Sequence, residues 1–489
     1  MQKERTALEN QNVRQESDLI GAKEVPADVY YGIQTLRAAE NFPITGYRMH
    51  TELIKAFAMV KKAAAIANFE VGQLDEKRKQ AIVRAAEEII EGKWHDQFIV
   101  DPIQGGAGTS MNMNTNEVIA NRALELLGEK KGDYQIISPV THVNMSQSTN
   151  DSFPTAVRIS TLMLIDQLLQ STEALRDAFK QKAKEFSGII KLGRTHLQDA
   201  VPIRLGQEFE AYARVLTRDM NRIENARYGL FEVNIGATAV GTGLNAEPKY
   251  TERVVALLKE MSGYPLYHAE HLIDATQNTD ALTEVSAALK ICMVNMSKIA
   301  NDLRLMASGP RGGLSEIRLP ARQPGSSIMP GKVNPVMAEV VNQVAFQVIG
   351  NDHTISLASE AGQFELNVME PVLVFNLHQS LTIMKNVFEV FRKYCVEGIV
   401  ANEEVCKQYV ERSIGVITAL NPHIGYEAST KIAKEALETG RSVRELCLKY
   451  ELLTEDELNE ILDPFAMTHP GIAGSSLLKQ KPENARFLH

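Results

Sequence analysis

Apolar side chains recur every three or four residues along several unusually long stretches of this chain. Such spacing places them on one face of an α-helix, so the pattern predicts long amphipathic helices. In the stretch 276–308 the apolar positions are Leu282, Val285, Leu289, Cys292, Met296, Ile299 and Leu303. The other long stretches are 154–186, 206–233, 335–359 and 371–394. Long helices with one apolar face bury it most economically in an antiparallel bundle, which predicts a five-helix bundle.

The region before these stretches shows shorter patterns. Helical spacing covers 53–69 and 76–91, and a third helix is expected from about 113 to 127. The segment 18–42 mixes turn formers with aromatic residues, which predicts ordered but irregular structure. This N-terminal region is therefore expected to be mainly helical.

Beyond residue 403 the helical stretches shorten again. The Asn421-Pro422 pair predicts a break, Gly440 predicts a helix end, and Thr454 followed by Glu457 has the spacing of a capping box. Strand patterns are sparse throughout, so the predicted fold class is all-α. We expect three domains: 1–150, mainly helical; 151–403, the long-helix bundle; and 404–489, a small helical domain.

Composition narrows the possible partners. The chain has 489 residues and a formal net charge of −9, with no run of Lys or Arg that could grip nucleic acid or a membrane surface. The first thirty residues lack the apolar core of a secretion signal, and no apolar run is long enough to span a bilayer. We therefore expect a soluble, cytoplasmic protein. Its four cysteines are widely separated and no metal-ligand cluster stands out, so no metal site is predicted.

One polar segment stands between two of the long helical stretches, with the sequence GSSIMPGKVNP over 325–335. Its glycines and prolines exclude a continuous helix, and its hydroxyls, amide and lysine can bind an anion. The helix expected after Pro335 would direct free N–H groups and the positive end of its dipole at the segment. Segments of this composition are commonly surface linkers, so the interpretation depends on other parts of the chain.

Three further polar clusters lie where loops or helix ends are expected. They are GGAGTSMNMNTNE (105–117), SQSTND (146–151) and GRTHLQD (193–199). Each has an ordinary explanation, since Ser, Thr and Asn before a helix are usually N-caps and a lone histidine is usually structural. Together the four clusters supply many neutral donors and one lysine, without a nucleophile triad or a dinucleotide fingerprint. This set of groups favours a small dianionic ligand and proton-transfer chemistry.

The same segments carry a resemblance to a known family. GSSIMPGKVN, GGAGTSMNMNTNE, QSTND, GRTHLQDA, NIGATAVGTGLN and NPHIGY resemble the signature segments of the fumarase/aspartase superfamily. Within it the chain resembles the aspartate ammonia-lyases, because Ser110, Met111 and Thr149 stand where class II fumarases usually carry Gln, Thr and Ser. A class II fumarase that removes water from malate, or a superfamily member with a structural role only, are the alternatives.

The resemblance implies reversible anti elimination of ammonia from L-aspartate to give fumarate, with no organic cofactor. It implies that Ser326 is the general base and removes a proton from the carbon next to the β-carboxylate. It also implies that Asn150 and His196 face the amine, with Glu339 orienting His196. Because a serine hydroxyl is a poor base, such a site must stabilise both the alkoxide and the enediolate with donors positioned beforehand.

The resemblance also implies which residues bind the two carboxylates. For the β-carboxylate they are Thr109, Ser148, Thr149 and Ser327. For the α-carboxylate they are Thr195, Lys332 and Asn334. In this superfamily each active site takes its segments from three subunits of a homotetramer with a twenty-helix core, so a homotetramer is expected here.

Overall fold

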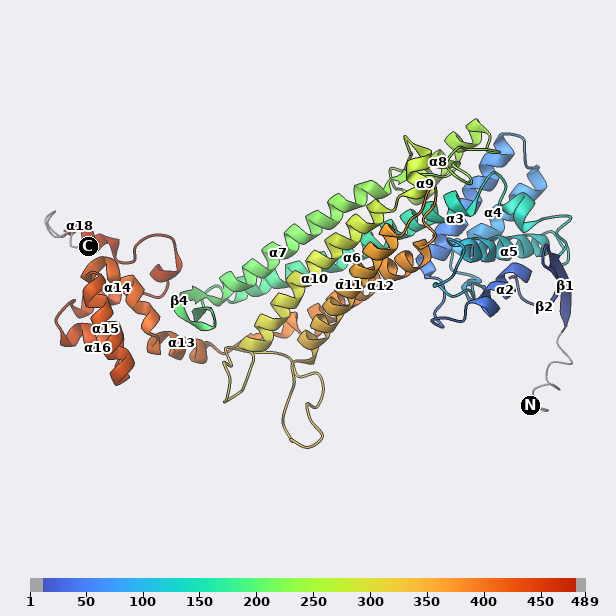
Figure 1. The fold of residues 1–489 in the computed structure, drawn as a ribbon. Helices are drawn as coiled ribbons and strands as arrows, with labels where there is room; N and C mark the ends of the chain where they lie inside the picture. Colours follow the sequence, from blue (N-terminus) through green and yellow to red (C-terminus); the bar gives the residue numbers. More distant parts are fainter. Residues whose placement is uncertain (1–11, 481–489) are drawn as a thin grey trace. The chain divides into compact units, whose positions relative to one another are not determined.

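The computed structural model describes residues 12–480, and most of these residues are helical (Figure 1). The chain divides into two compact units, each made of three segments. Unit 1 comprises the segment that ends at Gln170, Asp219–Met293 and Val344–Lys385. Unit 2 comprises Ser171–Arg218, Val294–Gln343 and the segment that begins at Asn386. The expected three-domain division stays a prediction beside this one.

All five long helices expected from the apolar pattern are present. They are α6 (Thr149–Glu185), α7 (Leu205–Ala226), α10 (Asp280–Met306), α11 (Val336–Glu360) and α12 (Glu370–Tyr394). Helix α7 ends before the expected boundary at 233, because the chain first forms a 3-10 turn, η3 (Arg227–Leu230), and then strand β5 (Glu232–Val233). The all-α prediction is confirmed, and among the described residues no helix is long and apolar enough to cross a lipid bilayer.

Unit 1 packs four shorter helices with parts of the long ones. The shorter helices are α3 (Thr51–Glu70), α4 (Glu76–Ile90), α5 (Thr109–Leu126) and α8 (Pro248–Ser262). Phe57 of α3 and Phe153 of α6 are both fully buried, with ring centroids 6.0 Å apart. Strand β5 pairs in parallel with β6 (Tyr267–His268), and α9 (Leu272–Gln277) precedes α10. Helix α5 matters most for function, because it begins inside the first predicted polar cluster.

The prediction of irregular structure over 18–42 is wrong. Strands β1 (Val13–Asp18) and β2 (Gly21–Pro26) form an antiparallel hairpin, followed by helix α2 (Ile33–Asn41). The buried carboxylate of Glu117 on α5 accepts N–H bonds from Gly32, Gln34 and Thr35 at the start of α2. A residue about 80 positions away therefore caps this helix, and local sequence does not contain that information.

Unit 2 contains a second hairpin and an aromatic core. Strands β3 (Ile190–Thr195) and β4 (Gln198–Arg204) pair with each other, and β7 (Ile317–Arg318) pairs with β8 (Val400–Ala401). The rings of Phe179, Phe186, Phe209, Tyr212 and Phe391 pack together with centroids 5.2–6.5 Å apart. These contacts hold parts of α6, α7 and α12 together within this unit.

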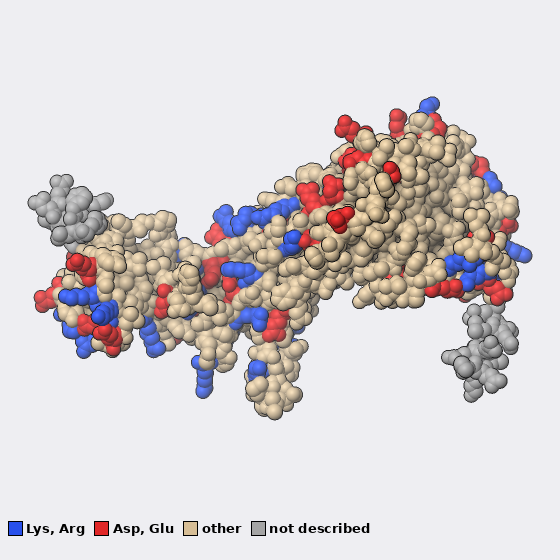
Figure 2. Space-filling view, viewed as in Figure 1, with Lys and Arg blue, Asp and Glu red and all other residues tan. Residues whose placement is uncertain are grey.

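Short helices complete unit 2. They are α13 (Glu403–Arg412), α14 (Ile417–Ile424), α15 (Tyr426–Thr439), α16 (Val443–Lys449), α17 (Glu455–Ile461) and α18 (Ser475–Gln480). Gly440 ends α15 with a φ of 70°, and Thr454 forms a capping box with Glu457, as predicted. The break expected at Pro422 is wrong, because this proline lies inside α14 and Gly425 ends that helix. Figure 2 shows acidic and basic side chains interspersed on the visible face of these C-terminal helices.

Candidate active site

The predicted site residues are divided between the two units. Thr109, Ser148, Thr149 and Asn150 belong to unit 1. Thr195, His196, Ser326, Ser327, Lys332, Asn334 and Glu339 belong to unit 2. Each group is held in place by the packing of its own unit.

The segment 148–151 forms the first turn of α6. The Ser148 hydroxyl accepts the N–H of Asn150 (3.2 Å), and the Ser148 N–H donates to Asp151 Oδ1 (3.0 Å), which is a reciprocal cap. Asp151 Oδ2 also accepts N–H bonds from Gly236 (3.0 Å) and Thr238 (2.9 Å). One buried carboxylate therefore fixes the start of α6 against the 234–247 loop, which contains the family-like segment NIGATAVGTGLN (234–245).

Burial controls the ionisation of Asp151. Its side chain is fully buried, and this burial raises its pKa to about 7, while the backbone N–H groups of Thr238, Ser148 and Gly236 oppose the rise. The neighbouring Asn150 donates its amide N–H to the carbonyl of Ala239 at 2.6 Å. The predicted amine-facing residue is thus held by the same loop.

Thr109 occupies the first position of α5, which begins earlier than the expected boundary near 113. Gly108 precedes it with a φ of 90°, and a Cβ there would lie 2.6 Å from a ring carbon of Phe153. A side chain at this position is therefore excluded by both conformation and space. Thr109 is exposed, and its hydroxyl donates to the carbonyl of Gly106 at 2.7 Å.

The first and second polar clusters meet through Asn112, one turn after Thr109. Its amide Nδ2 donates to Thr149 Oγ1 (3.0 Å) and to Asn144 Oδ1 (3.1 Å). Thr109 and Thr149, predicted to bind the same carboxylate, thus belong to helices joined by a direct side-chain hydrogen bond. This contact agrees with the expectation that remote polar clusters are brought together.

No pattern in the sequence selected Lys61, a residue of α3 that bonds to Asn112 and to two residues of the segment before α6. Its side chain is fully buried, and its ammonium donates to Asn112 Oδ1 (2.6 Å), Asn144 Oδ1 (2.9 Å) and Gln147 Oε1 (2.9 Å). Burial lowers its pKa to about 7, and the charge of Asp151 opposes that shift. The only local signal was a lysine inside an otherwise apolar helical face, which is easily taken for a residue at the edge of that face.

In unit 2, Thr195 and His196 lie at the tip of the β3–β4 hairpin. His196 and Leu197 have φ angles of 55° and 59°, and positive values at both central residues are typical of a tight hairpin turn. The sequence suggested a loop or helix end here, and the observed hairpin presents both Thr195 and His196 on the exposed surface. The preceding Arg194 donates to Glu316 Oε1 at 2.8 Å, and Glu316 is fully buried.

The 325–334 segment is a loop between α10 and α11 that is held mainly by its own hydrogen bonds. Gly325 N donates to the Lys332 carbonyl (2.8 Å), and Asn334 Nδ2 donates to the Gly325 carbonyl (2.8 Å). Figure 1 shows this yellow-gold segment projecting from the helices of its unit, and Figure 2 shows few charged side chains on it. Ser327 and Lys332 are exposed, and Ser326 is half-buried.

The Ser326 hydroxyl accepts two backbone N–H bonds from its own loop, as serines in turns commonly do. Its Oγ accepts the backbone N–H groups of Ile328 (3.2 Å) and Met329 (3.1 Å). Donors that point at a hydroxyl oxygen stabilise its deprotonated form more than its neutral form. The loop therefore already contains two groups suited to a serine that must act as a base.

Helix α11 begins at Val336, directly after Pro335, as predicted, and Glu339 lies in its first turn. Within the single chain, no hydrogen bond among the described residues joins Glu339 to His196, or either of them to Ser326. The expectation that Glu339 orients His196 stays a prediction.

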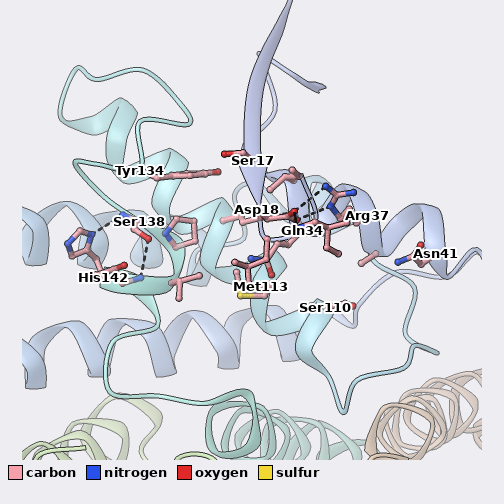
Figure 3. Close-up of a pocket in the computed structure, with 18 of the residues that line it drawn as sticks. Ser17, Asp18, Gln34, Arg37, Asn41, Ser110, Met113, Tyr134, Ser138 and His142 are labelled. Carbon is pink, nitrogen blue, oxygen red and sulfur yellow. Dashed lines mark hydrogen bonds and ion pairs between the residues drawn. The ribbon is translucent and has the colours of Figure 1, made fainter. Parts of the chain in front are cut away.

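A large cavity lies away from the predicted site residues. It has a volume of about 1030 Å³ and lies within unit 1, beside β1, α2 and the π-helical turn η2 (Pro139–Val143). Figure 3 shows Asp18 paired with Arg37 on one side, and Ser138 bonded to His142 on the other. None of the eleven predicted site residues lines it, so cavity size alone would have pointed to another place.

Comparison with known proteins identifies the family. The sequence profile of a family described as Lyase matches residues 21–350, and that of the Fumarase C C-terminus matches residues 416–469. The chain belongs to the fumarase/aspartase superfamily. The aspartate ammonia-lyase of Bacillus subtilis (strain 168) is 70% identical over 96% of this chain and 98% of its own length. That of Escherichia coli (strain K12) is 51% identical over 94% of this chain and 97% of its own length.

Solved structures of the superfamily share this fold. A fumarate lyase:delta crystallin from Brucella melitensis bound to cobalt aligns with a TM-score of 0.92 and 50% identity, covering 94% of this chain and all of that one. A recombinant class II fumarase from Schistosoma mansoni aligns with a TM-score of 0.90 and 36% identity over the same shares. The superfamily resemblance inferred from short segments is thus confirmed along nearly the whole chain.

Proposed function

We propose that this chain is an ammonia-lyase that converts L-aspartate reversibly to fumarate and ammonium. The observation that carries the proposal is the full-length identity of 51–70% with curated proteins named aspartate ammonia-lyase. The matched profile supports a lyase, and the relatives named aspartate ammonia-lyase support carbon–nitrogen bond cleavage as its reaction. The class II fumarase from Schistosoma mansoni, at 36% identity, is the corresponding match for the alternative, malate dehydration.

Ser326 is the proposed base. Its oxygen removes a proton from the carbon next to the β-carboxylate, and the electron pair left behind spreads into that carboxylate as an enediolate. The two N–H groups already directed at Ser326 Oγ lower the cost of its alkoxide, and this supports the assignment. The amine then leaves as ammonia once it carries a proton, with Asn150 and His196 as the proposed residues facing it and Glu339 orienting His196.

The residues proposed to bind the two carboxylates match the charge that each carboxylate carries during the reaction. Lys332 carries the only full positive charge in the 325–334 loop and would bind the α-carboxylate, whose charge is constant, with Thr195 and Asn334. Thr109, Ser148, Thr149 and Ser327 supply neutral hydroxyl donors to the β-carboxylate, where charge grows during the reaction. Neutral donors that strengthen as charge accumulates favour the transition state over the bound substrate.

We also propose a homotetramer with active sites shared between three subunits. Apolar side chains are exposed on two of the long helices, including Phe346 (66% exposed) and Leu357 (57%) on α11 and Val294 (50%) on α10. A second copy that covers these helices would bury such residues, as in an obligate interface. Sedimentation of the purified protein tests this assembly directly.

The decisive experiment follows fumarate absorbance with aspartate and with malate as separate substrates. Fumarate formed from aspartate but not from malate is the expected result. Fumarate from malate alone would overturn the proposal in favour of a hydratase. No product from either substrate, in a folded tetramer, would favour a structural superfamily member.

A further inference from the structure

A chain of hydrogen bonds runs from the Lys61 ammonium through the Asn112 amide to the hydroxyl of Thr149, a predicted substrate-binding residue. Each group in this chain donates to the next. A lysine ammonium has three N–H donors and no acceptor. All three donate, to Asn112 Oδ1, Asn144 Oδ1 and Gln147 Oε1, at 2.6–2.9 Å. Each of these amides must therefore turn its oxygen toward Lys61, which leaves its NH₂ group to donate to other acceptors.

The NH₂ groups continue the same direction. Asn112 Nδ2 donates to Thr149 Oγ1 (3.0 Å) and to Asn144 Oδ1 (3.1 Å). Gln147 Nε2 donates to the carbonyls of Val143 (3.2 Å) and Met145 (3.0 Å). Asn144 Nδ2 donates to the carbonyl of Gln147 at 3.2 Å. The whole segment before α6 is thus organised around one buried positive charge.

The consequence falls on Thr149. Because its oxygen already accepts a bond from Asn112, its own O–H is the group left to donate. Among the described residues, no acceptor for that O–H is found in the chain. A hydroxyl held in this way is suited to a carboxylate, which only accepts, and unsuited to a ligand group that only donates.

We propose that Lys61 and Asn112 are positioning residues that fix Thr149 as a hydrogen-bond donor to the substrate's β-carboxylate. Neither residue contacts substrate in this arrangement. Lys61 sets the orientation of the Asn112 amide, and Asn112 sets the orientation of the Thr149 hydroxyl. The inference rests on the proposed function, in which Thr149 binds that carboxylate.

Asn112→Asp tests the direction of the chain of hydrogen bonds with little change in shape. The substituted carboxylate still accepts from Lys61, forming an ion pair, but it has no N–H to offer Thr149 Oγ1 or Asn144 Oδ1, and Asn144 Oδ1 keeps its bond from Lys61. The Thr149 hydroxyl must then donate to this carboxylate and is lost to the substrate. We expect kcat for aspartate to fall by about 10- to 100-fold, the range for one lost donor, with a smaller change in KM.

A double-mutant cycle with Thr149→Val distinguishes an effect of Asn112→Asp on the Thr149 hydroxyl from a general loss of folded structure. The double variant is expected to be no worse than Thr149→Val alone, within about threefold, because the hydroxyl on which Asn112 acts is gone. With Thr149→Ser, which retains the hydroxyl, Asn112→Asp is expected to keep its full effect. Inhibition by succinate, a saturated dicarboxylate, is expected to change less than kcat. Should Asn112→Asp fail to fold, Asn112→Ala replaces it in the same cycle, because it also removes the donor.

Two results would overturn the inference. One is multiplication of the Asn112→Asp and Thr149→Val effects in the double variant. The other is unchanged kcat in Asn112→Asp while Thr149→Val is impaired. Failure of the proposed function is distinguishable, because the unmodified protein would then form no fumarate from aspartate.

Discussion

Two regions predicted to share one chemical task are built in opposite ways. The start of α6, with Ser148, Thr149 and Asn150, is held by two buried charged residues, Lys61 and Asp151, through hydrogen bonds to three other segments of unit 1. The 325–334 loop of unit 2 is held mainly by bonds between its own atoms, and much of it is exposed. The first region is fixed when the unit folds, whereas the second can change conformation without disturbing a core.

The difference indicates that the two regions have different roles in the proposed reaction: the start of α6 binds a carboxylate in a fixed geometry, and the loop carries the general base. Groups that stabilise the negative charge developing on the β-carboxylate must be oriented before the reaction, because their reorientation during the reaction would raise the activation barrier. A general base that removes a proton inside a closed site must also admit substrate and release product, which suits a loop. Substitutions in the loop should therefore alter catalysis alone, whereas substitutions around α6 should alter catalysis and stability together.

The largest expected effect is on Ser326→Ala. Loss of the base should lower kcat by about 10³-fold or more, because no other group in the loop can replace an alkoxide. The melting temperature should change by no more than about 2 °C, since the hydroxyl is half-buried and bonds only within the loop. Ser327→Ala is the matched control, with a smaller loss. Near-normal kcat in Ser326→Ala would contradict the assignment.

Substitutions of Lys332 in the loop and of Lys61 near the start of α6 test this difference between the two regions. Lys332→Met should raise KM for aspartate by about 100-fold, because a charge-assisted bond to the α-carboxylate is lost. Its free energy of unfolding should stay within about 0.5 kcal/mol of the unmodified protein, since Lys332 is exposed. Kinetics with aspartate and urea denaturation measure the two effects, and an unchanged KM would remove Lys332 from the site.

Lys61→Met should lower stability as well as catalysis. The amide oxygens of Asn112, Asn144 and Gln147 each lose a charged donor, so we expect the free energy of unfolding to fall by about 3 kcal/mol. Urea denaturation at constant protein concentration measures this loss. If Lys61→Met were as stable as the unmodified protein, the start of α6 would not depend on that buried charge.

The smallest expected effect concerns how firmly α5 is held. Arg122 of α5 makes two bonds to Glu88 of α4 (2.6 and 2.9 Å), and this pairing is the main reason that the pKa of Glu88 falls to about 2. Because this pKa is below the unfolded value of about 4.5, the stabilisation is complete above pH 4.5 and is lost as pH falls toward 2. Glu88→Gln should cost about 1 kcal/mol at pH 7, and this difference should shrink between about pH 4.5 and 2. A difference that is constant with pH would contradict the charge argument.

Local patterns in the sequence were sufficient for the helices and for the polar segments. The long stripe containing Leu289 and Met296 became α10, and Thr454 became a helix cap, because helical periodicity and capping depend on residues a few positions apart. The same logic failed at 18–42, where the distant Glu117 caps α2. It also failed at Pro422, where one missing N–H near the end of a short helix did not end it.

The sequence by itself determined which side chains could do chemistry here, because residue types and their order are written in it, and family resemblance followed from them. Only the tertiary structure decided how those side chains are oriented. Lys61 and Thr149 are far apart in the chain, yet the folded unit joins them through a single amide, that of Asn112. Hydrogen-bond direction depends on which donors and acceptors meet in space, and a linear pattern does not record such meetings.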